Sequence, residues 1–429
     1  MLGTEGRPIL LLIALFSLFA SLLVPGRVLD YNVNGWMWVL ILVASVAVLL
    51  RHPDQVSFPV WLWLPWMAYL LLRVSDWHPA ELQSTIQILC PVAVGMAASA
   101  YALPPDRLAG GFGWWLRLSF YALMALFVFK VLPWTLSDVE NSGYITGGIA
   151  TLFFQSYFLC RYLVAGRRWS DLLCLIAAIL VPVISALRGP IAGSLALCLL
   201  IVAPLSFRRR LVIGVAALLV GLVVFYMPKM QYKMFYSGHG TVADLRADNP
   251  DFNWSGRQAM WETVEDGLKE KPWLGQGSNA SAAVMRQAYL TQSELHNDWL
   301  RIRYNYGRVG VILFVVTMAM QVFLAYRRGR RAPPEARVLL FAGASCFIPF
   351  AVVMFTDNIL VYCQYFTAPH FLLLGYGYAA AKQAAKQPQA SAAPVVSGQK
   401  QKRRTGMHTW NGRGMFRRRT ARPMPRPTV

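Results

Sequence analysis

Arg188 is a charged residue at the edge of two apolar runs. It lies in the segment I-S-A-L-R-G-P-I-A-G, where Gly189 and Pro190 indicate a sharp turn. A charge in such a place is costly unless it is paired or faces water, so it is a candidate for binding or catalysis. Its planar guanidinium suits a phosphate or diphosphate. The alternative is an arginine that extends to lipid headgroups and has no further role.

Arg257 is a second candidate for anion binding. The segment N-W-S-G-R-Q-A-M-W-E-T-V-E-D-G-L-K-E-K-P predicts one amphipathic helix, with Ser255 as its N-cap and Trp261 in its apolar stripe. Arg257 would then lie in the first turn, where free backbone amides and the helix dipole favour an anion. The alternative is a solvated arginine that pairs with Glu262 or Asp251.

His296 is the candidate general base. Asn297 and Asp298 follow it directly, and Arg303 lies about two helical turns further on. A neutral imidazole can take the proton of a hydroxyl near neutral pH, whereas the alternative is an ordinary surface histidine. Because Glu294 and Asp298 share a helix face that His296 does not share, we expect no metal site here. We also expect no cofactor.

The composition indicates that a membrane surrounds the elements that position these residues. Of 429 residues, 56% are hydrophobic and only 14% are charged, about half the usual charged share. All six cysteines lie in apolar runs, so no disulfide framework is implied. These features exclude a cytosolic enzyme, a nucleic-acid-binding globule and a disulfide-stapled secreted domain.

We expect an all-α polytopic membrane protein with about twelve spans, because each apolar run is close to the ~20 residues that cross a bilayer. The expected spans are 8–25, 34–50, 57–73, 84–103, 112–132, 145–165, 170–187, 190–207, 210–227, 306–326, 336–356 and 359–381. Two pairs of spans have almost no connection, so each pair is predicted to form a tight hairpin. These pairs are 170–187 with 190–207 and 336–356 with 359–381.

Lysine and arginine are distributed unevenly between the two sides of these spans. With the N-terminus in the cytoplasm, the inner loops hold twelve arginines and the outer loops or their margins hold four Lys/Arg, the bias that orients membrane proteins. The tail 382–429 adds twelve Lys/Arg and no acidic residue. We expect it to be disordered and cytoplasmic. Most of the net charge of +21 is therefore topological, with anionic lipid rather than nucleic acid as its partner.

The long connection 228–305 is expected on the outer side, between the spans of 1–227 and those of 306–381. It holds nine Lys/Arg and nine Asp/Glu together with several large aromatic residues, a composition that argues against disorder. Long loops of this kind are usually functional. Arginines suit a diphosphate, a histidine suits an incoming hydroxyl, and aromatic rings suit sugars. The combination suggests transfer of a sugar from a lipid diphosphate to an alcohol.

Three motifs, in this order along the chain, resemble those of the O-antigen ligase family, part of the superfamily of bacterial O-antigen ligases and polymerases. The matching residues are Ser185–Gly189, Ser255–Arg257 with Trp261, and His296–Asn297 followed after nine residues by Gly307 and then Gly310. The resemblance implies twelve spans and one large periplasmic loop between spans nine and ten. It also implies a multi-pass protein of the bacterial inner membrane with both termini in the cytoplasm.

The resemblance further implies a glycosyltransferase that completes lipopolysaccharide. The donor would be O-antigen linked to undecaprenyl diphosphate, and the acceptor a sugar hydroxyl of the lipid A–core oligosaccharide. His296 would be the general base of an inverting displacement without metal, and Arg188, Arg257 and Arg303 would bind the diphosphate. The supporting residues would be Asn297, Asp298, Trp261 and Gly307, with Asp298 able to orient the imidazole.

Other functions remain open from the sequence. Within the superfamily, an O-antigen polymerase uses a lipid-linked acceptor, and a protein O-oligosaccharyltransferase uses a protein hydroxyl. The first typically has two arginine-bearing outer loops and the second a sizeable domain after the last span, whereas this chain has one long loop and a short tail. A transporter of polyprenyl-linked sugars needs polar groups along a mid-membrane cavity, and most spans here lack them.

Overall fold

The computed structural model describes residues 9–23, 27–28, 31–75, 77–101, 111–133, 145–246, 248–289 and 294–391. Most of these residues are helical. The strands β1 (Arg27–Val28) and β2 (Tyr31–Asn32) form one short antiparallel pair. Most of the expected basic tail, residues 392–429, lies outside the described ranges.

A helix covers part or all of each of the twelve segments expected to cross the membrane. These helices are α1 (Ile9–Leu23), α2 (Val33–Arg51), α3 (Leu64–Leu72), α4 (Pro79–Ser99), α6 (Gly113–Leu126), α8 (Ile145–Val164), α9 (Trp169–Ile184), α10 (Arg188–Leu200), α11 (Phe207–Phe225), α16 (Asp298–Arg331), α17 (Pro334–Val353) and α18 (Thr367–Ser391). Short 3-10 turns at Pro53–Gln55 and Val60–Leu62 precede α3, and a π-helical turn at Phe127–Val131 continues α6.

Among the described residues, α4, α16 and α17 are long and apolar enough to cross a membrane. The helix α11 qualifies together with α12 (Pro228–Met234), which follows it after a bend of 77°. Five further helices are apolar but shorter. The chain therefore has the character of a membrane protein, and the twelve-span topology stays a prediction.

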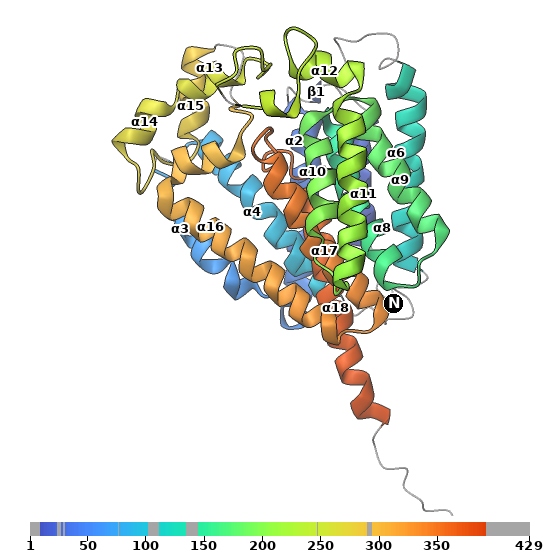
Figure 1. Ribbon diagram of the computed structural model, residues 1–429. Helices are drawn as coiled ribbons and strands as arrows, with labels where there is room; N and C mark the ends of the chain where they lie inside the picture. The colour runs from blue at the N-terminus through green and yellow to red at the C-terminus, as the bar shows by residue number, and fades with distance from the viewer. Residues whose placement is uncertain are drawn as a thin grey trace, which may run out of the picture.

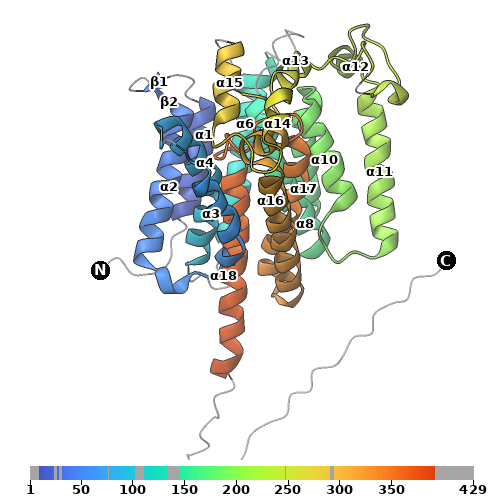
Figure 2. The same ribbon diagram turned by 90° about the vertical axis from the view of Figure 1, so that its left-hand side faces the viewer.

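The centre of the bundle is formed by α4, α17 and α18. The helix α18 packs on α4 and α17, while α17 also packs on α8, α10 and α16, as Figures 1 and 2 show. The helix α11 stands at the edge against α10. It exposes apolar side chains such as Val212, Leu219 and Val223, a surface that fits contact with lipid.

The two predicted hairpins have different outcomes. Only residues 185–187 separate α9 from α10, as predicted. The second hairpin prediction is wrong, because α17 ends at Val353, α18 begins at Thr367, and 354–366 is an irregular loop. Asp357 and Asn358 favour turns through side-chain bonds to nearby backbone, and Asp357 Oδ1 accepts from Asn358 N at 2.8 Å. At its far end α18 continues to Ser391, so the first residues of the expected tail are helical.

The segment 228–297 gathers at one end of the bundle, opposite the end where the last turns of α18 lie (Figure 1). It contains α12, a 3-10 turn at Val242–Asp244, α13 (Arg257–Glu262), α14 (Glu265–Glu270) and α15 (Ala280–Ala288). The single amphipathic helix predicted here is wrong, since it is divided into α13 and α14 at Thr263 and Val264. Val264 is buried in a small core with Met285, Leu295 and Tyr304.

The helix α16 has a kink at Gly307 (φ 66°, ψ −167°). This combination of angles is essentially restricted to glycine. The kink frees the backbone to bind the 272–275 loop, because Arg308 N donates to Pro272 O at 3.0 Å and Val309 N donates to Trp273 O at 3.1 Å. A Cβ at Gly307 would overlap with the carbonyl group of Trp273. Gly307 therefore joins the segment 228–297 to α16.

Candidate active site

His296 lies immediately before the N-cap of α16. Asn297 caps this helix, because its side chain accepts from Leu300 N at 2.9 Å. His296 has a positive φ of 50°, which ends the preceding loop in a sharp turn. Its side chain is 25% exposed. The motif pair His296–Asn297 thus provides an accessible imidazole and the N-cap that fixes the start of α16.

Two residues of the 354–366 loop face the imidazole. His296 Nδ1 lies 3.2 Å from Asn358 Nδ2 and 3.6 Å from Asp357 Oδ1. Asp357 is only 7% exposed, so water screens its charge weakly. The Asn358 amide can only donate to Nδ1, which suits the tautomer with the proton on Nε2. The Asp357 carboxylate favours a proton on Nδ1, and in that tautomer Nε2 is free to act as a base. Asp357 and Asn358 were missed from the sequence because they were assigned to the tip of a tight hairpin.

Asp298 connects the loop to α16 rather than contacting the imidazole. Its backbone N donates to Met354 O at 2.8 Å, and its Oδ2 accepts from Leu360 N at 2.8 Å. Trp299 Nε1 adds a bond to Ala351 O at 2.8 Å. Asp298 is fully buried, as expected for a residue that joins two backbone segments. These bonds hold Asp357 and Asn358 opposite His296.

Arg301, rather than Arg303, is the arginine of α16 that contacts the 354–366 loop. It is buried, forms an ion pair with Glu294, and its Nη2 lies 3.3 Å from Asn358 Oδ1. Arg303 is exposed, because residues two apart on a helix point in opposite directions. The useful signal was the i, i+3 spacing between Asp298 and Arg301, whose Oδ1 and Nε are 3.7 Å apart.

Arg188 begins α10, and its side chain contacts the segment 228–297. Its Nη1 donates to the carbonyl of Asn253, its Nη2 donates to Ser255 Oγ at 2.7 Å, and the guanidinium lies 5.9 Å from the Phe252 ring centroid. The prediction of Ser255 as a helix N-cap is wrong. Gly256 is the N-cap, with φ 72°, and Ser255 itself has φ 55°. This left-handed pair turns the Ser255 hydroxyl towards Arg188.

The turn between α9 and α10, which is followed by Arg188 and Gly189, packs closely on the 354–366 loop that contains Asp357. A Cβ at Gly189 would overlap with Thr356 Oγ1, so a larger residue there would require the Thr356 side chain to move. The motif that contains Arg188 and the loop that contains Asp357 are therefore neighbours. Sequence spacing could not reveal this contact, since the two segments are far apart along the chain.

Arg257, at the start of α13, is half-buried and close to both Arg188 and Asp357. Burial lowers the pKa of the Arg257 guanidinium, and the negative charge of Asp357 opposes this effect. Arg188 and Arg257 are near enough to repel each other. Two arginines held together in this way favour an anion between them, and a diphosphate supplies the required charge.

Further residues complete the surroundings of these arginines. In α12, Lys229 Nζ lies 3.3 Å from Ile184 O and Lys233 Nζ lies 3.4 Å from Ser185 O, so both lysines lie over the hairpin. Neither lysine was among the site residues predicted from the sequence. Trp261 Nε1 donates to Leu295 O at 3.0 Å, which anchors α13 to the residue before His296.

An apolar groove of about 310 Å³ lies in the bundle near the turn that carries Arg188. It is lined by residues of α8, α9, α10 and α11. Val183, Ile191 and Val224 line its outer end, next to the turn that carries Arg188. The described residues bring no three His, Cys, Asp or Glu side chains into a group that could hold a metal ion.

The comparison with protein families agrees with the motif resemblance. Residues 173–315 match the family model described as O-antigen ligase. The match covers a third of the chain and includes Arg188, Arg257 and His296, so the predicted family is confirmed over this segment. Asp357 and Asn358 lie outside it. No protein of curated function matches the chain.

Proposed function

We propose that the protein is a periplasm-facing glycosyltransferase of the bacterial inner membrane. It transfers O-antigen polysaccharide from undecaprenyl diphosphate to a sugar hydroxyl of the lipid A–core oligosaccharide. The observation that carries the proposal is an accessible imidazole, His296, backed by Asp357 and lying near Arg188 and Arg257. A base beside an anion-binding cluster meets the two chemical requirements of this transfer.

The proposed reaction is a single displacement with inversion at the anomeric carbon. His296 Nε2 takes the proton of the acceptor hydroxyl while that oxygen forms a bond to the anomeric carbon. The bond from this carbon to the diphosphate oxygen breaks, and undecaprenyl diphosphate leaves with the electron pair. Arg188 and Arg257 stabilise the negative charge that develops on it. The imidazolium then releases its proton to water.

The same arrangement suits a lipid donor. The groove beneath Arg188 is almost entirely apolar and opens between α11 and its neighbours. A polyprenyl chain in this groove would place its diphosphate at Arg188 and Arg257, with Lys229 and Lys233 nearby. The donor carries its own activation in the diphosphate bond, so the reaction needs no nucleotide on the periplasmic side.

The test uses the purified full-length protein in detergent with undecaprenyl-diphosphate-linked glycan and rough lipopolysaccharide. Ligation gives a ladder of lipopolysaccharide bands on a gel, and we expect the ladder to persist in EDTA because the arginines handle the diphosphate. Longer lipid-linked glycan would instead identify a polymerase. Glycan on added protein would identify an oligosaccharyltransferase. No product of any kind, with intact donor, would leave a transporter as the better account.

A further inference from the structure

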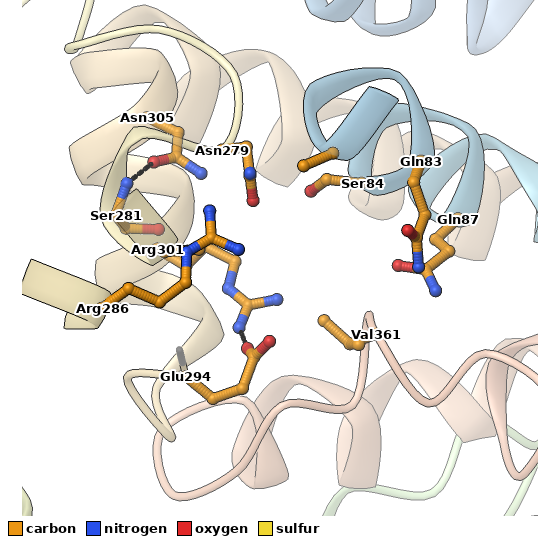
Figure 3. Close-up of a pocket in the computed structure, with 12 residues that line it drawn as sticks. Gln83, Ser84, Gln87, Asn279, Ser281, Arg286, Glu294, Arg301, Asn305 and Val361 are labelled. Atoms are coloured by element: carbon orange, nitrogen blue, oxygen red, sulfur yellow. Dashed lines mark hydrogen bonds and ion pairs between the residues drawn. The ribbon is translucent and has the colours of Figure 1, made fainter. Parts of the chain in front are cut away.

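A second cavity, which unlike the groove is polar, lies between α4, α15 and α16. Its volume is about 170 Å³, and Figure 3 shows it. Gln83, Ser84 and Gln87 line it from α4, and Asn279 and Arg286 line it from α15 and the turn before it. The volume is below the ~300–1,000 Å³ of pockets for drug-sized ligands. A site of this size and polarity suits a single sugar ring.

The walls of this cavity are held in place by bonds that leave its lining groups available. Ser281 N donates to Asn305 Oδ1 at 2.8 Å, which joins α15 to α16. The hydroxyls of Thr85 and Ser278 lie 2.9 Å apart and join α4 to the turn before α15. In the described part of the chain, no hydrogen bond occupies the side chains of Gln83 or Gln87. They can therefore bind a ligand without breaking a protein contact.

The charge of the cavity is positive. Arg301 is neutralised by its ion pair with Glu294, whereas Arg286 is exposed and has no ion pair among the described residues. Figure 3 shows the two guanidinium groups side by side at the same wall. A cation beside amide and hydroxyl groups fits a sugar that carries a phosphate or a carboxylate.

The cavity is separate from Arg188 and Arg257, neither of which lines it. Both sites reach His296 through the 354–366 loop. Asp357 lies near His296 and Arg257, while Asn358 contacts both His296 and Arg301, which lines the cavity. An inverting displacement needs separate places for the leaving group and the incoming hydroxyl, on opposite faces of the sugar. With the diphosphate at the arginines, the cavity is the remaining polar site connected to His296 and is left for the acceptor.

From this arrangement we propose that the cavity is an acceptor subsite, in which Arg286 binds an anionic sugar next to the sugar that carries the reacting hydroxyl. The inference rests on the proposed function and adds the chemical class that the acceptor must contain. Arg286 is a specificity residue, because in this proposal it binds a neighbouring sugar of the acceptor and does not touch the reacting atoms. Sugars without an acidic group would lack this contact.

The test is the variant Arg286→Gln, with Arg246→Gln as the matched control, since Arg246 is also an exposed arginine of residues 228–297 and pairs with the exposed Asp248. Initial rates are measured with purified full-length protein, saturating donor and varied rough lipopolysaccharide. We expect the Arg286 variant to raise the acceptor KM about tenfold or more, with kcat and the donor KM unchanged. The control should match the wild type.

A second acceptor separates charge from other effects. In rough lipopolysaccharide with its phosphates removed and its carboxyl groups reduced, the wild type and Arg286→Gln should have the same, high acceptor KM. An unchanged acceptor KM in the variant would overturn the inference. So would a raised donor KM, which would assign the cavity to the donor glycan, or a defect that persists with the neutral acceptor.

Binding of the acceptor without donor distinguishes this inference from the proposed function. If wild-type protein gave no transfer, the proposed function would fail. The affinity for intact rough lipopolysaccharide should still fall about tenfold in Arg286→Gln and stay unchanged in Arg246→Gln. Equal affinities of all three proteins would overturn the acceptor subsite, even where transfer occurs.

Discussion

At His296, the two neighbours of Nδ1 have opposite hydrogen-bonding character. Asn358 Nδ2 can only donate to Nδ1, at 3.2 Å, and this bond forms in the tautomer with the proton on Nε2. Asp357 Oδ1, 3.6 Å from Nδ1, favours the tautomer with the proton on Nδ1, and this is the tautomer in which Nε2 can act as the base. Once Nε2 has taken a proton, the same carboxylate stabilises the imidazolium. Asp357 is therefore expected to contribute more to the rate than Asn358.

This assignment predicts the effect of Asp357→Asn. The change keeps the size of the side chain but removes the charge, so we expect kcat to fall about tenfold to a hundredfold, less than the ~10²–10⁴ of a complete general base. The measurement is the initial rate of ligation by purified protein at saturating donor and acceptor. Asp266→Asn, at an exposed position of α14, should keep the wild-type rate. An equal rate in Asp357→Asn would remove Asp357 from the mechanism.

Single residues were predictable from the sequence where their chemistry conflicts with their surroundings. Arg188 and Arg257 were recognisable as cations on the side where positive charge is scarce. Asp357, Asn358 and Arg301 were not, because a loop residue next to a helix end and one arginine among several give no such signal. Their importance follows from contacts between segments about 60 residues apart.

At the scale of elements, α16 joins the candidate active site to the bundle. Its first turn carries the cap at Asn297 and the buried Asp298, and its kink at Gly307 receives the 272–275 loop. Hydrophobic runs predicted the positions of the helices well, because a helix in lipid needs only length and apolar side chains. They did not predict the irregular loop 354–366, whose residues are as apolar as those of the helices around it.

The kink predicts a specific loss of stability. Gly307→Ala places a Cβ against the Trp273 carbonyl at backbone angles that alanine rarely adopts, with a cost of about 1–3 kcal/mol or more. We expect a midpoint of thermal unfolding several degrees lower, measured by intrinsic fluorescence in detergent. Gly35→Ala in α2, where a Cβ meets no atom within 4 Å, is the control. Equal midpoints for both variants would show that the contact is not required.

For the molecule as a whole, the distribution of the net charge of +21 predicts its orientation in the membrane. The segment that contains α12 to α15 lies at one end of the bundle, and residues 228–305 hold nine Lys/Arg and nine Asp/Glu. The arginines at the start of α11 and the end of α16 belong to the inner loops of the predicted topology. These counts predict an orientation, which stays a prediction, and they gave no signal for the packing of α18 at the centre.

Thiol labelling tests this orientation. Lys269→Cys in α14 and Arg330→Cys at the end of α16 are both at exposed positions, and five of the six native cysteines are buried. In cells with a permeable outer membrane, a membrane-impermeant maleimide should label the Lys269 variant. It should label the Arg330 variant only after the inner membrane is opened. The reverse pattern would place the candidate active site in the cytoplasm.

If His296 is the base of a sugar transfer, ligation must depend on its imidazole. The rate of ligation by purified His296→Ala is compared with that of the wild type and of His239→Ala, which changes an exposed histidine of residues 228–297. We expect a loss of about 10²–10⁴ in kcat for His296→Ala, unchanged thermal stability, and a wild-type rate for His239→Ala. A near-normal rate in His296→Ala would show that His296 is not the base.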